Sequence, residues 1–137
     1  MDPLSITASI AAVLQITGTI ISYLSDVLDA PHDRMKLASE LSGLVSLLQV
    51  LRIRVQQAKP EDPWFATVLE LTAKNHPLDQ LESDLVLLTA KIEPPTGIKI
   101  IGKRLTWKFD KAEVTNILSK IERIKTLVTL ALTNDLL

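Results

Sequence analysis

Cysteine is absent from the 137-residue chain, and glycine and aromatic residues are scarce. Without a thiol, disulfides, zinc-thiolate sites and thiol nucleophiles are excluded. With four glycines and 4% aromatic residues, leucine, isoleucine, valine and alanine must fill the interior. Apolar residues still make up 47% of the chain, which excludes overall disorder. This composition is typical of an all-helical domain.

Charge is missing from one long stretch, because no charged side chain occurs between Pro3 and Ser25. About 20 apolar residues suffice to cross a bilayer, but this stretch also contains serine, threonine and glutamine. A secretory signal begins with positive charge, whereas this chain has Asp2, so we expect no signal peptide. The stretch is interpreted either as a membrane segment or as a buried helix of a soluble bundle.

Charge elsewhere is unevenly distributed around a net value of −1. Residues 59–97 carry −4 and residues 98–111 carry +4. The chain as a whole has no basic field of the kind that binds nucleic acid, so no nucleic-acid partner is expected.

Prolines mark the expected ends of helices. They predict helices between Pro3 and Pro31, between Pro31 and Pro60, from Trp64 to about Ala73, between Pro77 and Pro94, and from Asp110 onward. The last helix is preceded by Asp110 and Glu113, which form a capping box.

Each long helix carries an apolar stripe that must be buried against another element. The stripe of the first helix is Ile6, Ile10, Val13, Leu14, Ile20, Ile21, Leu24, Val27 and Leu28, and that of the second is Leu37, Leu41, Leu44, Leu48, Leu51 and Val55. The helix after Pro77 carries Leu78, Leu81, Leu85, Leu88 and Ile92, and the last helix carries Val114, Ile117, Leu118, Ile121, Ile124, Val128 and Ala131. We therefore predict an all-α, mostly antiparallel bundle of four long helices with one or two short ones, forming a single domain over residues 1–137.

Catalytic and cofactor motifs are weak. The stretch GIKIIGKR, Gly97 to Arg104, approaches a phosphate-binding loop, but Arg104 stands where the loop needs a hydroxyl. His32 and His76 each neighbour a proline and are predicted to be exposed turn or cap residues. Asp79, Glu82 and Asp84 are predicted to form a solvated face. We expect no enzyme, no cofactor and no metal site.

The segment 98–109 alternates apolar and basic residues and is predicted to be a short helix. Lys99, Lys103, Arg104 and Lys108 are interleaved with Trp107 and Phe109. A basic amphipathic element with an aromatic anchor suits an anionic membrane surface, so these residues, with Trp107, are candidates for contact with lipid headgroups or a partner. In the alternative interpretation Trp107 and Phe109 pack into the bundle and the lysines are solvated or pair with the acidic block.

The first helix is a candidate conditional element, buried at rest and able to enter a bilayer once released. Its lack of charge removes the main obstacle to insertion. The candidate membrane-inserting residues are Leu4, Ile6, Ile10, Val13, Leu14, Ile20 and Ile21. The two states need to differ by only a few kcal/mol for a partner to shift the balance.

Several motifs resemble one known family. They are MDPLSITASIAAVLQITGTI with YLSDV at the start, DPWFATVLEL at 62–71, PLDQLESDL at 77–85, KRLTWKFDKAEVTNILSKIERIKTL at 103–127, and LALTND at 130–135. In this order they resemble the HeLo-like N-terminal domain of fungal STAND proteins, which are NOD-like receptors. The pattern differs at Trp107-Lys108-Phe109-Asp110, where the family is expected to have WPFK.

The resemblance implies a helical effector domain at the N-terminus of a larger receptor, followed there by a nucleotide-binding oligomerisation domain and a repeat domain. Related HeLo-type domains damage the plasma membrane in programmed cell death and heterokaryon incompatibility. By resemblance we expect a cytoplasmic domain that oligomerises with itself and targets anionic lipids of the plasma membrane through its first helix. The alternative is a soluble adaptor that binds another helical domain.

Overall fold

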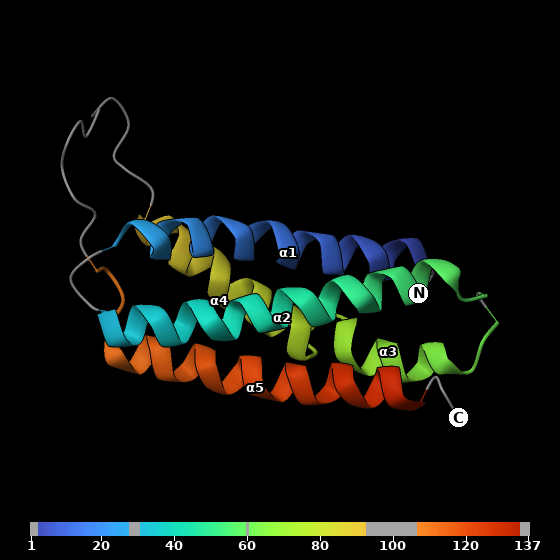
Figure 1. Ribbon diagram of the computed structural model, residues 1–137. Helices are drawn as coiled ribbons and strands as arrows, with labels where there is room; N and C mark the ends of the chain where they lie inside the picture. Colours follow the sequence, from blue (N-terminus) through green and yellow to red (C-terminus); the bar gives the residue numbers. More distant parts are fainter. Residues whose placement is uncertain (1–2, 28–30, 60, 93–106, 135–137) are drawn as a thin grey trace.

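The computed structural model describes residues 3–27, 31–59, 61–92 and 107–134 (Figure 1). These residues form α1 (Pro3–Asp26), α2 (Pro31–Gln57), α3 (Trp64–Thr72), α4 (Pro77–Ile92) and α5 (Lys111–Asn134). No strand occurs among them, so the predicted all-α bundle is confirmed. A short helix was predicted over residues 98–109. For residues 107–109 the prediction was wrong, because they are not helical, and residues 98–106 lie outside the described residues.

The helix starts follow from proline and aspartate chemistry. Pro3, Pro31 and Pro77 are the first residues of α1, α2 and α4, a position where the missing N–H costs nothing and the fixed φ favours the helix. At α5 the backbone N–H of Glu113 donates to Asp110 Oδ1 at 2.7 Å. Only this half of the predicted capping box forms, because the Glu113 side chain is turned toward α4 instead.

A tight turn separates α3 from α4. Asn75 has a φ of 64°, in the left-handed region that asparagine tolerates better than most residues. Its backbone N–H donates to Asp79 Oδ2 at 2.8 Å, and its carbonyl accepts from Gln80 Nε2 at 2.8 Å. These bonds fix the elbow at which α4 turns away from α3 toward α1 (Figure 1).

The helices form a ring in the order α1, α2, α5, α4. Within the described residues, α1 does not contact α5, and α2 does not contact α4. In Figure 1, α1, α3 and α4 run one way, and α2 and α5 run the other. Consecutive long helices are therefore antiparallel, whereas α1 with α4 and α2 with α5 are parallel neighbours. The connection from α2 to α4, which contains α3, crosses a diagonal of the ring.

The core rows differ in side-chain shape between the two diagonals. On α1 and α5 the rows are mainly β-branched, and on α2 and α4 they are almost entirely leucine. The row is Ile6, Ile10, Val13, Thr17, Ile20 and Leu24 on α1, continued by Val27 just after it, and Val114, Ile117, Ile121, Ile124, Val128 and Ala131 on α5. It is Leu37, Leu41, Leu44, Leu48, Leu51 and Val55 on α2, and Leu78, Leu81, Leu85 and Leu88 on α4. Each side of the ring thus packs a β-branched row against a leucine row.

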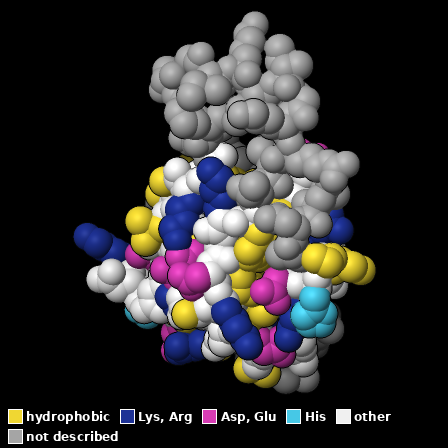
Figure 2. Space-filling view, turned by 90° about the vertical axis from the view of Figure 1, so that its left-hand side faces the viewer, with side chains coloured by type: hydrophobic (Ala, Val, Ile, Leu, Met, Phe, Trp, Pro, Cys, Tyr) yellow, Lys and Arg dark blue, Asp and Glu magenta, His cyan; other side chains and the backbone are white. Residues whose placement is uncertain are grey.

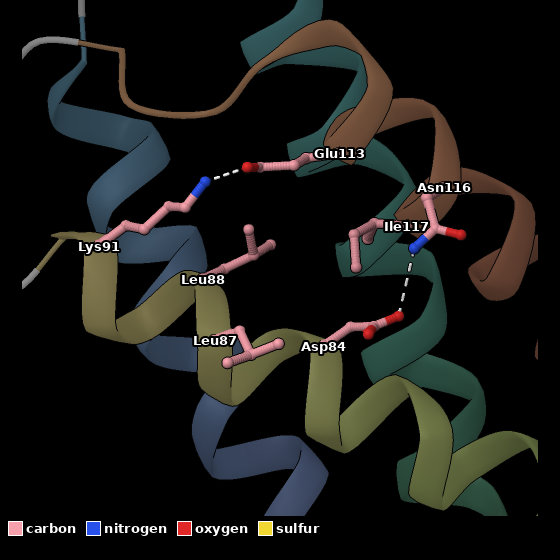
Figure 3. A pocket seen from close by; sticks show the side chains of 7 residues that line it. All are labelled: Asp84, Leu87, Leu88, Lys91, Glu113, Asn116 and Ile117. Carbon is pink, nitrogen blue, oxygen red and sulfur yellow. Dashed lines mark hydrogen bonds and ion pairs between the residues drawn. The ribbon is translucent and has the colours of Figure 1, made fainter.

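Three ion pairs join helices among the described residues, and α5 takes part in each of them. Lys125 of α5 pairs with Glu40 of α2 at 2.9 Å. Lys120 pairs with Asp84 of α4, and Glu113 with Lys91 of α4. The prediction that Asp84 faces solvent with Asp79 and Glu82 was therefore wrong, because Asp84 points across to α5 (Figure 3).

The end of α5 is closed by α3. The buried Trp64 donates its indole N–H to the carbonyl of Ala131 at 2.7 Å. The guanidinium of Arg54 lies 5.7 Å from the centre of the Trp64 ring, within the range of a cation–π contact. This contact ties the last turns of α2 and α5 to the first turn of α3.

The packing of the leucine rows is tested by Leu48→Ala at the middle of α2. Leu48 is fully buried, so the free energy of unfolding should fall by about 2–5 kcal/mol. The matched control is Val50→Ala two residues along, where the side chain is 48% exposed and the change should stay within about 0.5 kcal/mol. Urea titration followed by circular dichroism measures both, and equal losses would contradict this packing.

Candidate functional site

Among the described helices, α1 packs against its two ring neighbours, α2 and α4, and against α3. Residues Leu4–Asp26 form a stretch of 23 residues that is long and apolar enough to cross a membrane by length and composition. Only 28% of the residues in its most apolar 18-residue window are buried. Much of its surface therefore faces away from the core.

The candidate membrane-inserting residues fall into three environments. Ile6, Ile10, Val13 and Ile20 are completely buried in the bundle core. Leu14 and Ile21 are half-buried and pack against that core. Leu4 is 79% exposed. Most of the set thus has a structural role in the bundle as described, and its members reach lipid only if α1 separates from α2 and α4.

Three hydroxyls on the outward side of α1 are bonded to carbonyls of their own helix. Ser9 Oγ donates to the carbonyl of Ser5, Thr19 Oγ1 to that of Gln15, and Ser25 Oγ to that of Ile21, at 3.0–3.3 Å. A hydroxyl bonded in this way needs no water or outside partner. The cost of moving this face into an apolar medium is correspondingly lower.

The inward face of α1 contains a defect at its centre. Thr17 occupies a core position with 1% of its surface exposed, and its Oγ1 has no hydrogen-bond partner among the described residues. A buried polar group without a partner costs about 1–3 kcal/mol. In contrast, the buried Thr72 of α3 donates to the carbonyl of Val68 at 3.0 Å. Thr17 therefore weakens the docking of α1.

The C-terminal end of α1 is fastened by contacts that the sequence pattern did not reveal. The hydroxyl of Tyr23 accepts the backbone N–H of Lys108 at 2.9 Å. The rings of Tyr23 and Phe109 lie 5.4 Å apart. On the α2 side, Arg34 Nη1 donates to the carbonyl of Val27 at 2.5 Å. The bond between Tyr23 and Lys108 joins residues 85 positions apart, and local periodicity does not predict contacts over such a separation.

The proposed lipid-contacting residues are only partly described. Lys99, Lys103 and Arg104 lie outside the described residues, as does the stretch 97–104 that approaches a phosphate loop. Trp107 is half-buried, packs against the core and meets Phe109 edge-on, with 5.3 Å between ring centres. Lys108 is exposed. The alternative in which Trp107 and Phe109 pack into the bundle therefore holds for both aromatic residues.

Charges of both signs are interspersed at the end of the bundle that carries the α1–α2 and α4–α5 connections. Figure 2 shows this end, with lysine or arginine beside aspartate or glutamate among the described side chains. His32 is exposed at the start of α2 and His76 at the α3–α4 turn, as predicted. His76 Nδ1 lies 2.7 Å from the carbonyl of Glu70. Within the described ranges, no group of three or more His, Cys, Asp or Glu is placed to hold a metal ion.

No family model matches this chain, and neither the curated proteins nor the solved structures contain a match to it.

The weak point at Thr17 is tested by Thr17→Val, with Thr72→Val as its control. Replacing the unpartnered hydroxyl of Thr17 by a methyl group should raise the free energy of unfolding by about 1 kcal/mol. Thr72→Val removes a hydroxyl that is hydrogen-bonded, so the free energy of unfolding should stay level or fall by up to about 1 kcal/mol. Chemical denaturation of the two variants gives both values. A loss of stability at Thr17 would show that its hydroxyl is satisfied.

Proposed function

We propose that this domain is a non-enzymatic effector that acts on membranes, in which α1 leaves the bundle and enters the bilayer. The observation that carries the proposal is an apolar 23-residue span, Leu4–Asp26, whose one charged residue is the last, and which is held in the ring mainly by apolar packing. It agrees with the expectation from the HeLo-like resemblance of the motifs. On this proposal the domain is the N-terminal effector of a fungal NOD-like receptor that functions in programmed cell death.

The arrangement of the ion pairs supports release of α1 rather than collapse of the whole bundle. All three described pairs connect α5 to α2 or to α4. Since α1 does not contact α5 within the described residues, its departure breaks none of them. Helices α2, α4 and α5 then keep their mutual packing, while the bond from Arg34 to the carbonyl of Val27, which lies beyond the apolar span, retains the C-terminal end of α1 near the bundle.

The energetics couple release of α1 to self-association. The core row of α1 moves from one apolar medium to another when the helix enters lipid, so its own transfer costs little. The leucine rows of α2 and α4 lose their cover, and each leucine side chain that becomes fully exposed costs about 1.5–3 kcal/mol. A few such exposures equal the total stability of a domain, about 5–15 kcal/mol. A second copy that covers these rows offsets this cost, and we propose a homo-oligomer as the active form.

The lipid partner is proposed to be anionic. Lys99, Lys103, Arg104 and Lys108 carry positive charge, and each basic residue near an anionic surface contributes about 1 kcal/mol. They follow α4, whose C-terminus lies at the same end of the bundle as that of α1 (Figure 1). The domain is then cytoplasmic at rest and at the plasma membrane when active, with receptor domains of the full-length chain as further partners.

A second candidate is an adaptor that keeps its bundle intact. The observation that favours it is a shallow groove of about 440 Å³ on α4, lined by Asp79, Glu82, Ser83, Val86 and Leu87. Val86 and Leu87 are 49% and 67% exposed there. Such a surface suits a helical partner with complementary basic and apolar residues.

The membrane function is tested by Gln15→Lys, which places a charge at the middle of α1. Gln15 is exposed in the bundle, so the fold should be retained, whereas a lysine at the centre of an inserted helix costs about 2.5–3.5 kcal/mol. Leakage of dye from anionic vesicles should fall by about 50-fold or more at that cost.

The matched control is Ser46→Lys, which adds the same charge to the exposed face of α2. It should leak dye as well as the native domain, because α2 stays out of the bilayer and the added charge favours anionic lipid equally. Equal leakage by the two lysine variants would overturn insertion of α1. Concentration-dependent self-association measured by light scattering, with no leakage from vesicles, would favour the adaptor.

A further inference from the structure

The side of the ring between α4 and α5 is the most sparsely packed, and two hollows lie along it. The first, of about 280 Å³, has an apolar lining of Leu87, Leu88 and Ile117 (Figure 3). Leu87 is 67% exposed, so a side chain from outside the domain can reach it. The second, of about 180 Å³, shares Asn116 with the first and extends to Arg123. We call the two hollows together the seam.

The second hollow carries a positive charge that is not balanced. Its lining contains Lys120 and Arg123 and no carboxylate. Lys120 pairs with Asp84, whereas none of the ion pairs among the described residues includes Arg123. Glu70 lines the neighbouring hollow at the α3–α4 turn but not this one. The seam therefore offers an apolar hollow beside one unpaired guanidinium.

The spacing of these two features fits a helix. Leu88 and Gln80 are eight residues apart on α4, which is about 12 Å at 1.5 Å per residue. Ile117 and Arg123 are six residues apart on α5, which is about 9 Å. Seven residues of a helix cover about 10.5 Å and keep both side chains on one face. In an extended segment, residues about 10 Å apart are three positions apart and point to opposite faces. The seam thus suits a helix with an apolar and an acidic residue seven positions apart.

The chain itself contains such a helix face. On the outward side of α4, Asp79 and Val86 are seven positions apart, and Ser83 lies between them. Val86 is 49% exposed. Asp79 Oδ2 accepts the backbone N–H of Asn75, and its Oδ1 accepts no hydrogen bond from the described residues. We call Asp79, Ser83 and Val86 the α4 row. The row calls for a basic and apolar partner, and the seam calls for an acidic and apolar one.

We propose that copies of this chain associate head to tail, with the α4 row of one copy docked in the seam of the next. Asp79 of the first copy pairs with Arg123 of the second, and Val86 of the first packs against Leu87 and Leu88 of the second. Because the two surfaces differ, each copy keeps one row and one seam open. Such a contact repeats into a ring or a filament.

This contact brings copies together before α1 leaves the bundle, and in that use it rests on the proposed function. The contact itself includes no residue of α1. Its test measures mass in solution, whereas the membrane function is tested by leakage from vesicles. The failure of one is therefore distinguishable from the failure of the other.

The test uses two variants that each lack one of the two surfaces. Arg123→Glu reverses the charge of the seam and leaves the α4 row intact, whereas Val86→Lys places a charge in the row and leaves the seam intact. Both positions are exposed, so the fold should be retained, as circular dichroism can check. In sedimentation the mass of the native chain should rise with concentration up to about 1 mM, since a contact of this size is weak. Each variant alone should stay monomeric over that range.

Mixing the two variants decides between a head-to-tail contact and any other. In equal amounts they should form dimers and nothing larger, because one supplies the intact row and the other the intact seam. The matched control Lys36→Glu, on the exposed surface of α2, should associate like the native chain. A native chain that stays monomeric, a variant that associates alone, or a mixture without dimers would each overturn the proposal. A native chain that stops at dimers would indicate a two-fold contact and would overturn it as well.

Discussion

The absence of charge along α1 is the constraint on which the account of this molecule depends. Before its last residue, Asp26, helix α1 has no charged side chain that could form an ion pair, so it is joined to the bundle by apolar packing and by bonds near its C-terminal end. Apolar packing has no preference between a protein core and a lipid interior, whereas an ion pair strongly prefers the protein. On the proposed function, the same property that lets α1 complete the core would also let it leave.

On the proposed function, the ion pairs among the remaining helices persist when α1 leaves. Helix α5 is diagonal to α1 and holds α2 and α4 through ion pairs at Glu40, Asp84 and Lys91. The unpartnered hydroxyl of Thr17 weakens the inner face of α1, while the hydroxyls of Ser9, Thr19 and Ser25 on its outer side are bonded to carbonyls of the same helix. These features point in one direction, toward a first helix docked less firmly than its neighbours.

Much of the fold follows from the sequence, because the information is local. Prolines at 3, 31 and 77 set three helix starts, and rows of leucine such as Leu37 to Val55 set the buried face of α2. The ring order does not follow in the same way. It depends on contacts between helices far apart in the chain, and only the division into β-branched and leucine rows hints at which helices are diagonal. Asp84 was misassigned for this reason, since its spacing alone indicates solvent and only the neighbouring Lys120 explains its direction.

The candidate site is predictable to a similar extent. The uncharged run is plain from the sequence, but the exposure of Leu4 and the complete burial of Ile10 depend on tertiary packing. The bond between Tyr23 and Lys108 and the ion pair between Lys91 and Glu113 join segments with no common periodicity. The aromatic residues Trp107 and Phe109 suit a membrane anchor by composition, yet they pack on the bundle because Tyr23 offers a ring of matching size.

The most direct test of the central claim is the environment of α1 in the presence of vesicles. The chain has no cysteine, so single cysteines at Gln15 and Ser46 can each carry a polarity-sensitive dye. On anionic vesicles the emission at position 15 should shift to the blue and be quenched by quenchers at the bilayer centre, while position 46 remains aqueous. A label at position 15 that stays in water while the vesicles leak would contradict the account.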